Sequence, residues 1–139
     1  MKIHISFRHK PGFVTVDLAK GLDPDDQIFS HEDDAGVIRH FHIRTLQALA
    51  TSDLLVTRPC DPEIANFISI HHNVTNLSRV AFRCHLPGLL CAFDDGTDLI
   101  VDGNHRYVWR TMHKMLTMQF YRLPESIWRQ SLLILPLGF

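Results

Sequence analysis

The amino-acid sequence predicts an α+β protein built as a single domain over residues 1–139. Short apolar runs are mixed with segments of helical periodicity, and clean repeats of a strand followed by a helix are missing. This pattern disfavours a doubly wound parallel sheet. A hydrophobic content of 45% with 21% charged residues is ordinary for a folded soluble protein, and the length is sufficient for a proper core.

The N-terminal third is expected to hold two short strands, an acidic loop and a helix. His4–Phe7 and Phe13–Leu18 have the composition of strands around a turn at residues 10–12, which are Lys-Pro-Gly. The polar and acidic stretch Gly21–Gly36 predicts a loop. Val37–Leu49 follows with apolar residues at helical spacing and predicts a helix.

The middle of the chain is expected to contain a strand within Thr51–Thr57 and then a helix with a clear start. Asp61 can cap this helix, Pro62 fits its first turn, and Glu63 complements its dipole. Asn76–Phe82 predicts another short helix. One apolar face of the longer helix is formed by Ile64, Phe67, Ile68 and His71.

A hairpin and a second helix are expected next. Leu89–Phe93 and Leu99–Val101 are apolar runs separated by Asp95-Gly96, which is a turn signal. In the segment from Tyr107 to Leu116 the apolar residues recur every three or four positions, which predicts a helix with one face packed in the core. That expected apolar face comprises His105, Val108, Trp109, Met112, Met115 and Leu116.

The C-terminal segment is expected to close the fold. Met118–Leu123 alternates as a strand does, and Ile127–Leu135 is strongly apolar, as either a strand or a helix. Phe120 and Trp128 are expected in the core or in an interface. The sequence shows no internal repeat.

Charge and cysteine content restrict the partners and the compartment. The net charge is −1 with neutral histidines, so direct DNA binding through bulk positive charge is not expected. No run reaches the length of a membrane span, and the N-terminus lacks the apolar region of a signal peptide. Cys60, Cys84 and Cys91 do not form a Cys-x-x-Cys pair of the kind that binds metals. Cys91 lies in an apolar run and is expected to be a buried thiol. Reduced thiols favour a location in the cytoplasm.

The segment Asp102-Gly103-Asn104-His105-Arg106 carries the strongest chemical signal. It lies where a buried strand is expected to turn into a helix, so backbone N–H groups and the positive end of a helix dipole point at one volume. Gly103 permits close approach to a ligand, Asn104 can cap the helix, and Arg106 matches phosphate oxygens. His105 can donate a hydrogen bond or transfer a proton. Asp102 can hold Mg²⁺, act as a base, or orient Arg106 or His105, while a plain tight turn is the alternative.

This motif, with the Pro-led strand Pro87-Gly88-Leu89-Leu90 upstream, resembles the nucleotide-binding core of the ParB/sulfiredoxin superfamily over Leu77–Pro124. Sulfiredoxins carry Gly-Cys-His-Arg at this position, ParB proteins that bind CTP carry Glu-Arg-Arg, and the free-serine kinases carry Asp-Gly-His-His-Arg. The kinase pattern is the most similar of the three. The resemblance implies a small mixed sheet flanked by helices and a nucleotide, with ATP the first candidate, on Gly103, Asn104, His105 and Arg106.

The resemblance also implies roles for residues outside the motif. Arg79 is expected to reach a phosphate and Asn76 a base or ribose; the alternative is a helix C-terminus where neighbouring histidines favour the dipole. By its position, Glu32 corresponds to the catalytic base of the serine kinases, against the alternative of a solvated acidic loop. The sequence has one histidine pair at residues 40 and 42 and another at residues 71 and 72. If the two pairs meet in the fold, they can form a metal site with Asp102, although their spacing is not diagnostic of one.

Three functions follow as expectations. The first is an ATP- and Mg-dependent phosphotransferase or nucleotide hydrolase in which Asp102, His105 and Glu32 are catalytic, Asp102 holds the metal, and the substrate is an unidentified small molecule or protein. The second is a nucleotide-gated or protein-binding module of DNA-associated or mobile-element biology, without turnover. The third is a ParB-like metal-dependent nuclease.

Overall fold

The protein was analysed as a computed structural model, and its α+β architecture agrees with the class that the sequence predicts. The chain divides into two compact units, residues 1–49 with 126–139, and residues 50–125. The expected core 77–124 lies within the second unit, and the expectation of one domain stays a prediction. No helix in the described part of the chain is long and apolar enough to cross a bilayer. The structure describes residues 2–6, 13–17, 27–71, 74, 77 and 80–133, with side chains from residue 27 onward.

The first unit begins with the two strands that the sequence predicts. Strands β1 (Lys2–Ser6) and β2 (Phe13–Asp17) pair antiparallel, with Lys2 opposite Asp17 and Ser6 opposite Phe13. The turn expected between them lies outside the described residues.

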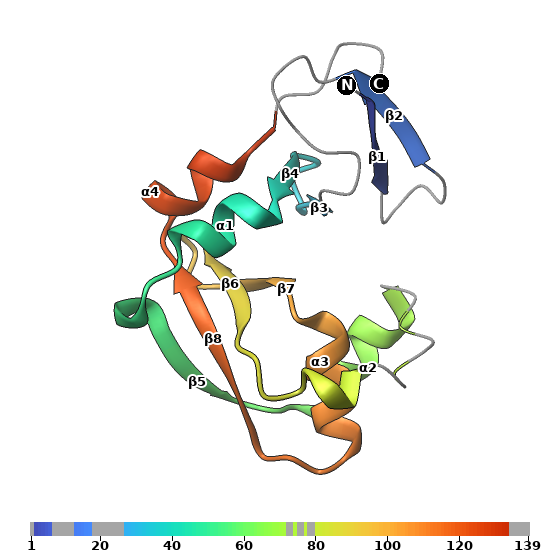
Figure 1. Ribbon diagram of the computed structural model, residues 1–139, viewed down its shortest axis with the longest axis vertical. Coiled ribbons are helices and arrows are strands. Elements are labelled where there is room, and N and C mark those ends of the chain that lie inside the picture. The colour runs from blue at the N-terminus through green and yellow to red at the C-terminus, as the bar shows by residue number, and fades with distance from the viewer. Residues whose placement is uncertain are drawn as a thin grey trace. The chain divides into compact units, whose positions relative to one another are not determined.

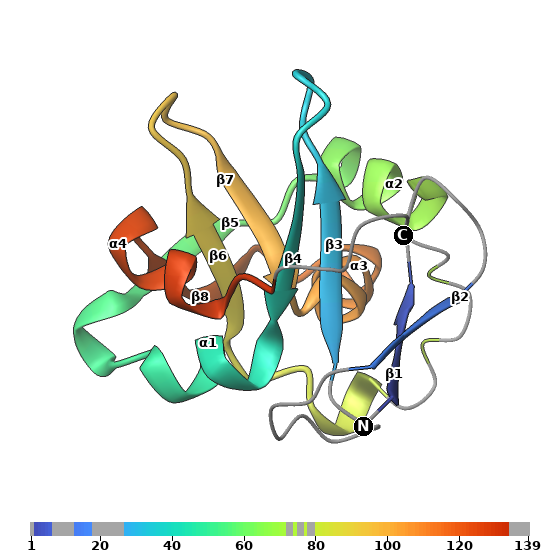
Figure 2. The same ribbon diagram turned by 90° about the horizontal axis from the view of Figure 1, so that it is seen from above.

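A second hairpin, over residues 28–42, takes the place of the described part of the expected acidic loop and of the first turns of the expected helix. Strands β3 (Ile28–Glu32) and β4 (Ile38–His42) pair antiparallel (Figure 2), and only α1 (Ile43–Leu49) is helical. Asp33 explains the difference, because its carboxylate accepts hydrogen bonds from the backbone N–H of Val37 at 2.8 Å and from Arg39 at 2.9 Å. These bonds stabilise a tight turn, so the acidic residues mark a hairpin.

The core of the first unit includes Phe41 and the C-terminal segment. Helix α4 (Glu125–Trp128) and the 3₁₀ helix η3 (Arg129–Ser131) begin the apolar C-terminal stretch, which therefore starts as a helix. The Trp128 ring meets the Phe41 ring edge-on at 5.7 Å, and both side chains are fully buried, which confirms Trp128 as a core residue. Leu132 then bridges to Phe41 in an antiparallel pairing.

The second unit is built on a small mixed sheet, in agreement with the expected architecture. The strand order is β5 (Leu55–Pro59), β8 (Thr117–Leu123), β6 (Gly88–Ala92) and β7 (Asp98–Asp102). The pairing of β6 with β8 is parallel, and the two outer pairings are antiparallel. The hairpin of β6 and β7 and the strand β8 confirm the sequence prediction, whereas the start of the expected strand at residue 51 is replaced by a 3₁₀ turn, η1 (Ser52–Leu54).

Helix α2 (Pro62–His71) starts as predicted but turns a different face to the core. The Asp61 carboxylate accepts a hydrogen bond from the Glu63 N–H at 2.8 Å and so caps the helix. Ala65 and Ile68 are buried, while the expected face is partly in solvent, because Ile64 is 46% and Phe67 is 55% exposed. The predicted helix over residues 76–82 is described only as a 3₁₀ turn, η2 (Val80–Phe82).

Helix α3 (Asn104–Met112) begins earlier and ends sooner than the spacing predicts. Its buried face holds Tyr107 and Val108, whereas Met112 is 65% and Leu116 is 83% exposed, so the expected core role of Met112 is wrong. Figure 1 shows α3 beside α2. Phe120 is confirmed in the core of this unit. It belongs to a cluster of buried side chains formed by Ala65, Ile68, Val74, Leu90, Tyr107, Val108, Met118 and Phe120.

The three cysteines are free thiols, as predicted. Cys91 is fully buried in β6, and burial raises the pKa of its thiol to about 12. This thiol is therefore a small apolar core group.

Candidate functional site

A single glycine, Gly103, connects β7 to α3. Gly103 links Asp102 at the end of β7 to Asn104 at the start of α3, with φ of 91° and ψ of 15°, a left-handed conformation. Its carbonyl accepts the first helical hydrogen bond, from the Tyr107 N–H at 2.8 Å. The motif therefore forms the strand-to-helix junction that the sequence predicts.

A second glycine allows β6 to lie close to this junction. The β6–β7 register shifts between Leu89 and Leu90, so Leu89 stands opposite Asp102. A Cβ on Gly88 would lie 2.7 Å from the Asp102 carbonyl oxygen, and a Cβ on Gly103 would lie 3.0 Å from the Gly88 Cα. The two backbones thus meet where a β-bulge redirects the end of β7, and bulges often aim side chains at functional sites.

Arg106 is held by two oxygens beside the junction. Its Nη2 lies 3.4 Å from Asp102 Oδ2, and its Nη1 donates to the Leu86 carbonyl at 3.4 Å. The side chains of the ion pair are only 15% and 16% exposed, so water screens it less than a surface pair. Of the roles expected for Asp102, the structure therefore supports the orientation of Arg106.

Asn104 does not cap the helix as expected. It is the first helical residue, is 8% exposed, and its Nδ2 donates to the Ile100 carbonyl at 3.2 Å, which ties the helix to β7. The cap position belongs to Gly103, and no side-chain hydrogen bond from it satisfies the first turn. The first-turn N–H groups therefore remain suited to an external acceptor.

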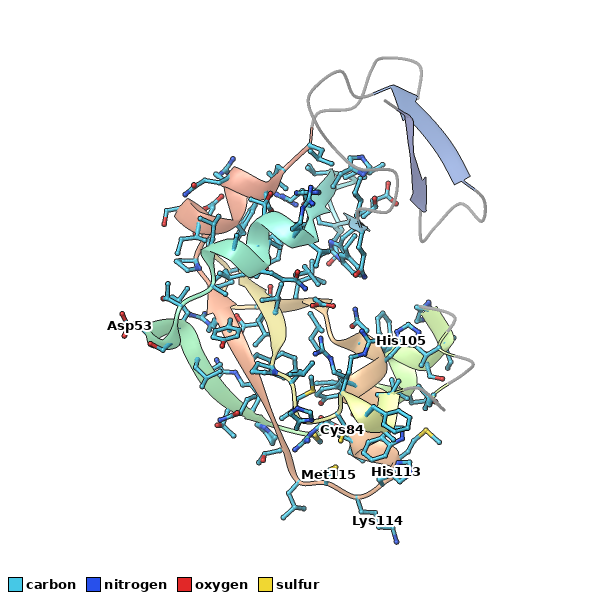
Figure 3. The ribbon with its side chains drawn as sticks, in the orientation of Figure 1. Asp53, Cys84, His105, His113, Lys114 and Met115 are labelled. Atoms are coloured by element: carbon cyan, nitrogen blue, oxygen red, sulfur yellow. The ribbon has the colours of Figure 1, made fainter. Side chains whose placement is uncertain are left out.

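His105 is exposed at the same end of α3. Figure 3 shows His105 and Lys114 at opposite ends of this helix. The first turn of α3 therefore carries two nitrogen donors, of which Arg106 is partly covered and His105 is open to solvent.

Arg110 is a residue whose role the sequence analysis missed. One turn after Arg106, its Nη1 donates to the Cys84 carbonyl at 3.0 Å, and its Nε donates to the Thr117 carbonyl at 2.9 Å. Arg106 and Arg110 thus fasten the segment before β6 to α3. The signal was the spacing of four between two arginines, which places them on one helix face.

The other predicted binding residues are not brought to the junction by the described structure. Asn76, Arg79 and His72 lie outside the described residues. Glu32 is exposed at the end of β3 and belongs to the first unit, so its catalytic role stays a prediction.

The expected metal cluster of histidines is not found in the described part of the chain, which holds no group of three or more His, Cys, Asp or Glu able to bind a metal. In the first unit the Nδ1 of His40 lies 2.7 Å from Ser30 Oγ, and that of His42 lies 2.6 Å from Thr45 Oγ1. Burial lowers the pKa of His40. His71 belongs to the second unit and contacts the Phe67 ring.

Comparisons of the chain with protein-family models, with curated proteins and with solved structures give no match. The resemblance to the ParB/sulfiredoxin superfamily therefore stays a prediction that rests on the motif and its context.

Proposed function

We propose that the β7–α3 junction binds the phosphates of a nucleotide, with ATP the first candidate, and that the chain transfers or hydrolyses a phosphoryl group with Mg²⁺. The observation that carries the proposal is the uncapped start of α3, which lies beside the held guanidinium of Arg106 and the exposed ring of His105. A helix N-terminus attracts anions through its dipole and its N–H groups, and a planar guanidinium matches phosphate oxygens.

The Asp102–Arg106 pair is compatible with phosphate binding. A guanidinium carries five N–H donors, and Asp102 and the Leu86 carbonyl engage only the two terminal nitrogens. A phosphate on the remaining donors would meet an arginine already fixed in one orientation, which lowers the entropic cost of binding.

The donor set of the junction fits a magnesium ion held mainly by substrate. Mg²⁺ in nucleotide sites commonly takes one or two carboxylates together with phosphate oxygens, and Asp102 provides a carboxylate beside the proposed phosphate position. When bound, the ion would neutralise charge that develops on the phosphates. Arg106 and the first-turn N–H groups would stabilise the same charge, and His105 would donate a proton or a hydrogen bond.

Calorimetry with ATP, ADP, CTP, GTP and NAD, each with and without Mg²⁺, tests binding. Arg106→Ala removes a charge-assisted contact of about 1.5–3 kcal/mol, so we expect roughly 10- to 100-fold weaker nucleotide binding. Lys114→Gln is the matched control, because it removes a positive charge at the far end of α3 and should leave affinity unchanged. Failure of every nucleotide to bind the wild type, or equal affinity in Arg106→Ala, would refute the assignment.

A second candidate function, a protein-binding module without turnover, is favoured by exposed apolar side chains in the second unit. Large apolar side chains on the surface often mark interaction sites. Phosphate release from a bound nucleotide separates the two functions, because a binding module shows none. The exposed apolar side chains are those of Phe67 (55%), Ile70 (64%), Phe82 (83%), Met112 (65%) and Leu116 (83%).

The nuclease hypothesis stays a prediction, which incubation with plasmid and Mg²⁺ or Mn²⁺ tests.

A further inference from the structure

The chain runs twice through the same order of elements, although its sequence shows no repeat. A hairpin, a helix, a strand and a second helix follow one another as β3, β4, α1, β5 and α2, and again as β6, β7, α3, β8 and α4. The hairpin strands have equal lengths and equal spacing in both passages, since 28–32 and 38–42 correspond to 88–92 and 98–102. The four strand ends of one hairpin thus correspond to those of the other at a constant separation along the chain.

The two hairpins also agree in their pairing and in their turns. Ser30 stands opposite His40, as Leu90 stands opposite Ile100 at the corresponding positions. Each turn contains a left-handed glycine whose N–H donates three residues back at 3.0 Å. These glycines are Gly36, with φ of 83°, and Gly96, with φ of 87°.

A local two-fold axis lies between β5 and β8. The dipeptide Pro62-Glu63 begins α2, and Pro124-Glu125 leads into α4, and this match also equates Thr57 with Gln119. These two equivalent residues pair directly with each other. The pairs on either side are then equivalent by symmetry, as in an isologous interface between two identical subunits. They are Leu55 with Tyr121 and Pro59 with Thr117.

The first passage runs from β3 to α2, and the second runs from β6 to α4. Each passage ends in a helix that belongs to the unit containing the hairpin of the other passage. In the second unit α3 packs against α2, which follows β5. In the first unit α1 packs against η3, which continues from α4 after β8. Each hairpin-linked helix is therefore covered by a segment of the other passage.

We infer that the chain is an internal duplication of one ββαβα unit, in which the last helix of each copy belongs to the compact unit that contains the hairpin of the other. The two copies differ at the strand-to-helix junction. In the first copy β4 continues into α1 at Ile43 without an intervening residue, whereas the second copy has the β7 bulge opposite Leu89 and Leu90 and the additional Gly103. The candidate site is thus a specialisation of one copy. This inference does not depend on nucleotide binding.

A circular permutant that exchanges the order of the copies tests the duplication. The permuted chain runs from Val80 to Phe139, continues at Met1 and ends at Arg79. Its new connection from η3 to β3 contains the β1–β2 hairpin, whereas the native connection from α2 to β6 is residues 72–87, and the two original ends are joined without a linker. We expect a monomer with native circular dichroism and a melting temperature within a few degrees of the wild type. A permuted chain that fails to fold would overturn the inference.

A control permutant and a cross-link make the test specific. Opening the chain between Asp94 and Asp95, in an exposed turn, divides one copy and should lower the melting temperature further; an equal or smaller loss would count against the duplication. Thr57→Cys with Gln119→Cys places two exposed thiols at the two-fold axis. Oxidation should join them in both the native and the permuted order, in a background that lacks Cys60 and Cys84. A permuted chain that does not cross-link has lost the symmetric pairing and would contradict the inference.

Discussion

Replacement of Gly103 by alanine tests the geometry of the junction most directly. Alanine in the left-handed region costs about 1–2 kcal/mol, of which about 0.4–1 kcal/mol is returned by stiffening the unfolded chain. The new Cβ would also lie 3.0 Å from the Gly88 Cα, 3.2 Å from Arg106 Nη2 and 3.2 Å from Met118 Cε. Because one of these neighbours is backbone, the crowding adds about 1–3 kcal/mol, and we expect a total of about 2–3 kcal/mol.

Gly96→Ala is the matched control, because it isolates the crowding from the backbone conformation. Gly96 has φ of 87° in the same unit, and a Cβ there would meet no atom within 4 Å. Urea unfolding should therefore show the Gly103 variant less stable than the Gly96 variant by about 1–3 kcal/mol, or by roughly 4–12 °C in melting temperature. If both variants lose the same stability, the close approach of the two backbones is wrong, and the junction is an ordinary turn.

Two further predictions concern groups in the core. His40 is buried with a lowered pKa, so the unfolded chain binds its proton more readily, and stability should fall as the pH drops through about 6.5. The melting temperature should consequently fall less between pH 7.5 and 5.5 in His40→Phe than in the wild type; equal losses would contradict the assignment. Cys91 should resist a thiol reagent at pH 8 in the folded protein, because its pKa is about 12, while Cys60 and Cys84, which are partly exposed, react. Mass spectrometry of the labelled protein counts the modified sites, and rapid labelling of Cys91 would disprove its burial.

Sequence reasoning succeeded where local chemistry determines the structure. Asp95-Gly96 marked the β6–β7 turn, and Asp61 with Pro62 marked the start of α2, because turns and caps depend on residues a few positions apart. The motif at residues 102–106 was placed correctly at the end of a strand and the start of a helix. Orientation of Arg106, one of the roles left open for Asp102, corresponds to the ion pair between these two residues.

The failures arose where distant parts of the chain decide the outcome. The acidic stretch before β4 was expected as a loop, but Phe29 pairs with Phe41 across the hairpin. The periodicity of α3 could not show that its C-terminal residue Met112 faces solvent, since that depends on which neighbours cover the helix. The sequence does not reveal the duplication, because the copies share few identical residues and their likeness lies in strand lengths, turn geometry and pairing.

The order in which the chain is synthesised has a consequence for its folding. The second unit, residues 50–125, is contiguous in sequence and is complete once β8 has left the ribosome. The first unit needs Trp128 against Phe41 and the hydrogen bond from the Leu133 N–H to the His40 carbonyl at 2.9 Å. Its β3–β4 hairpin is synthesised before the second unit but is completed only by residues 128–133, which follow that unit in the sequence, so the second unit can fold before the first.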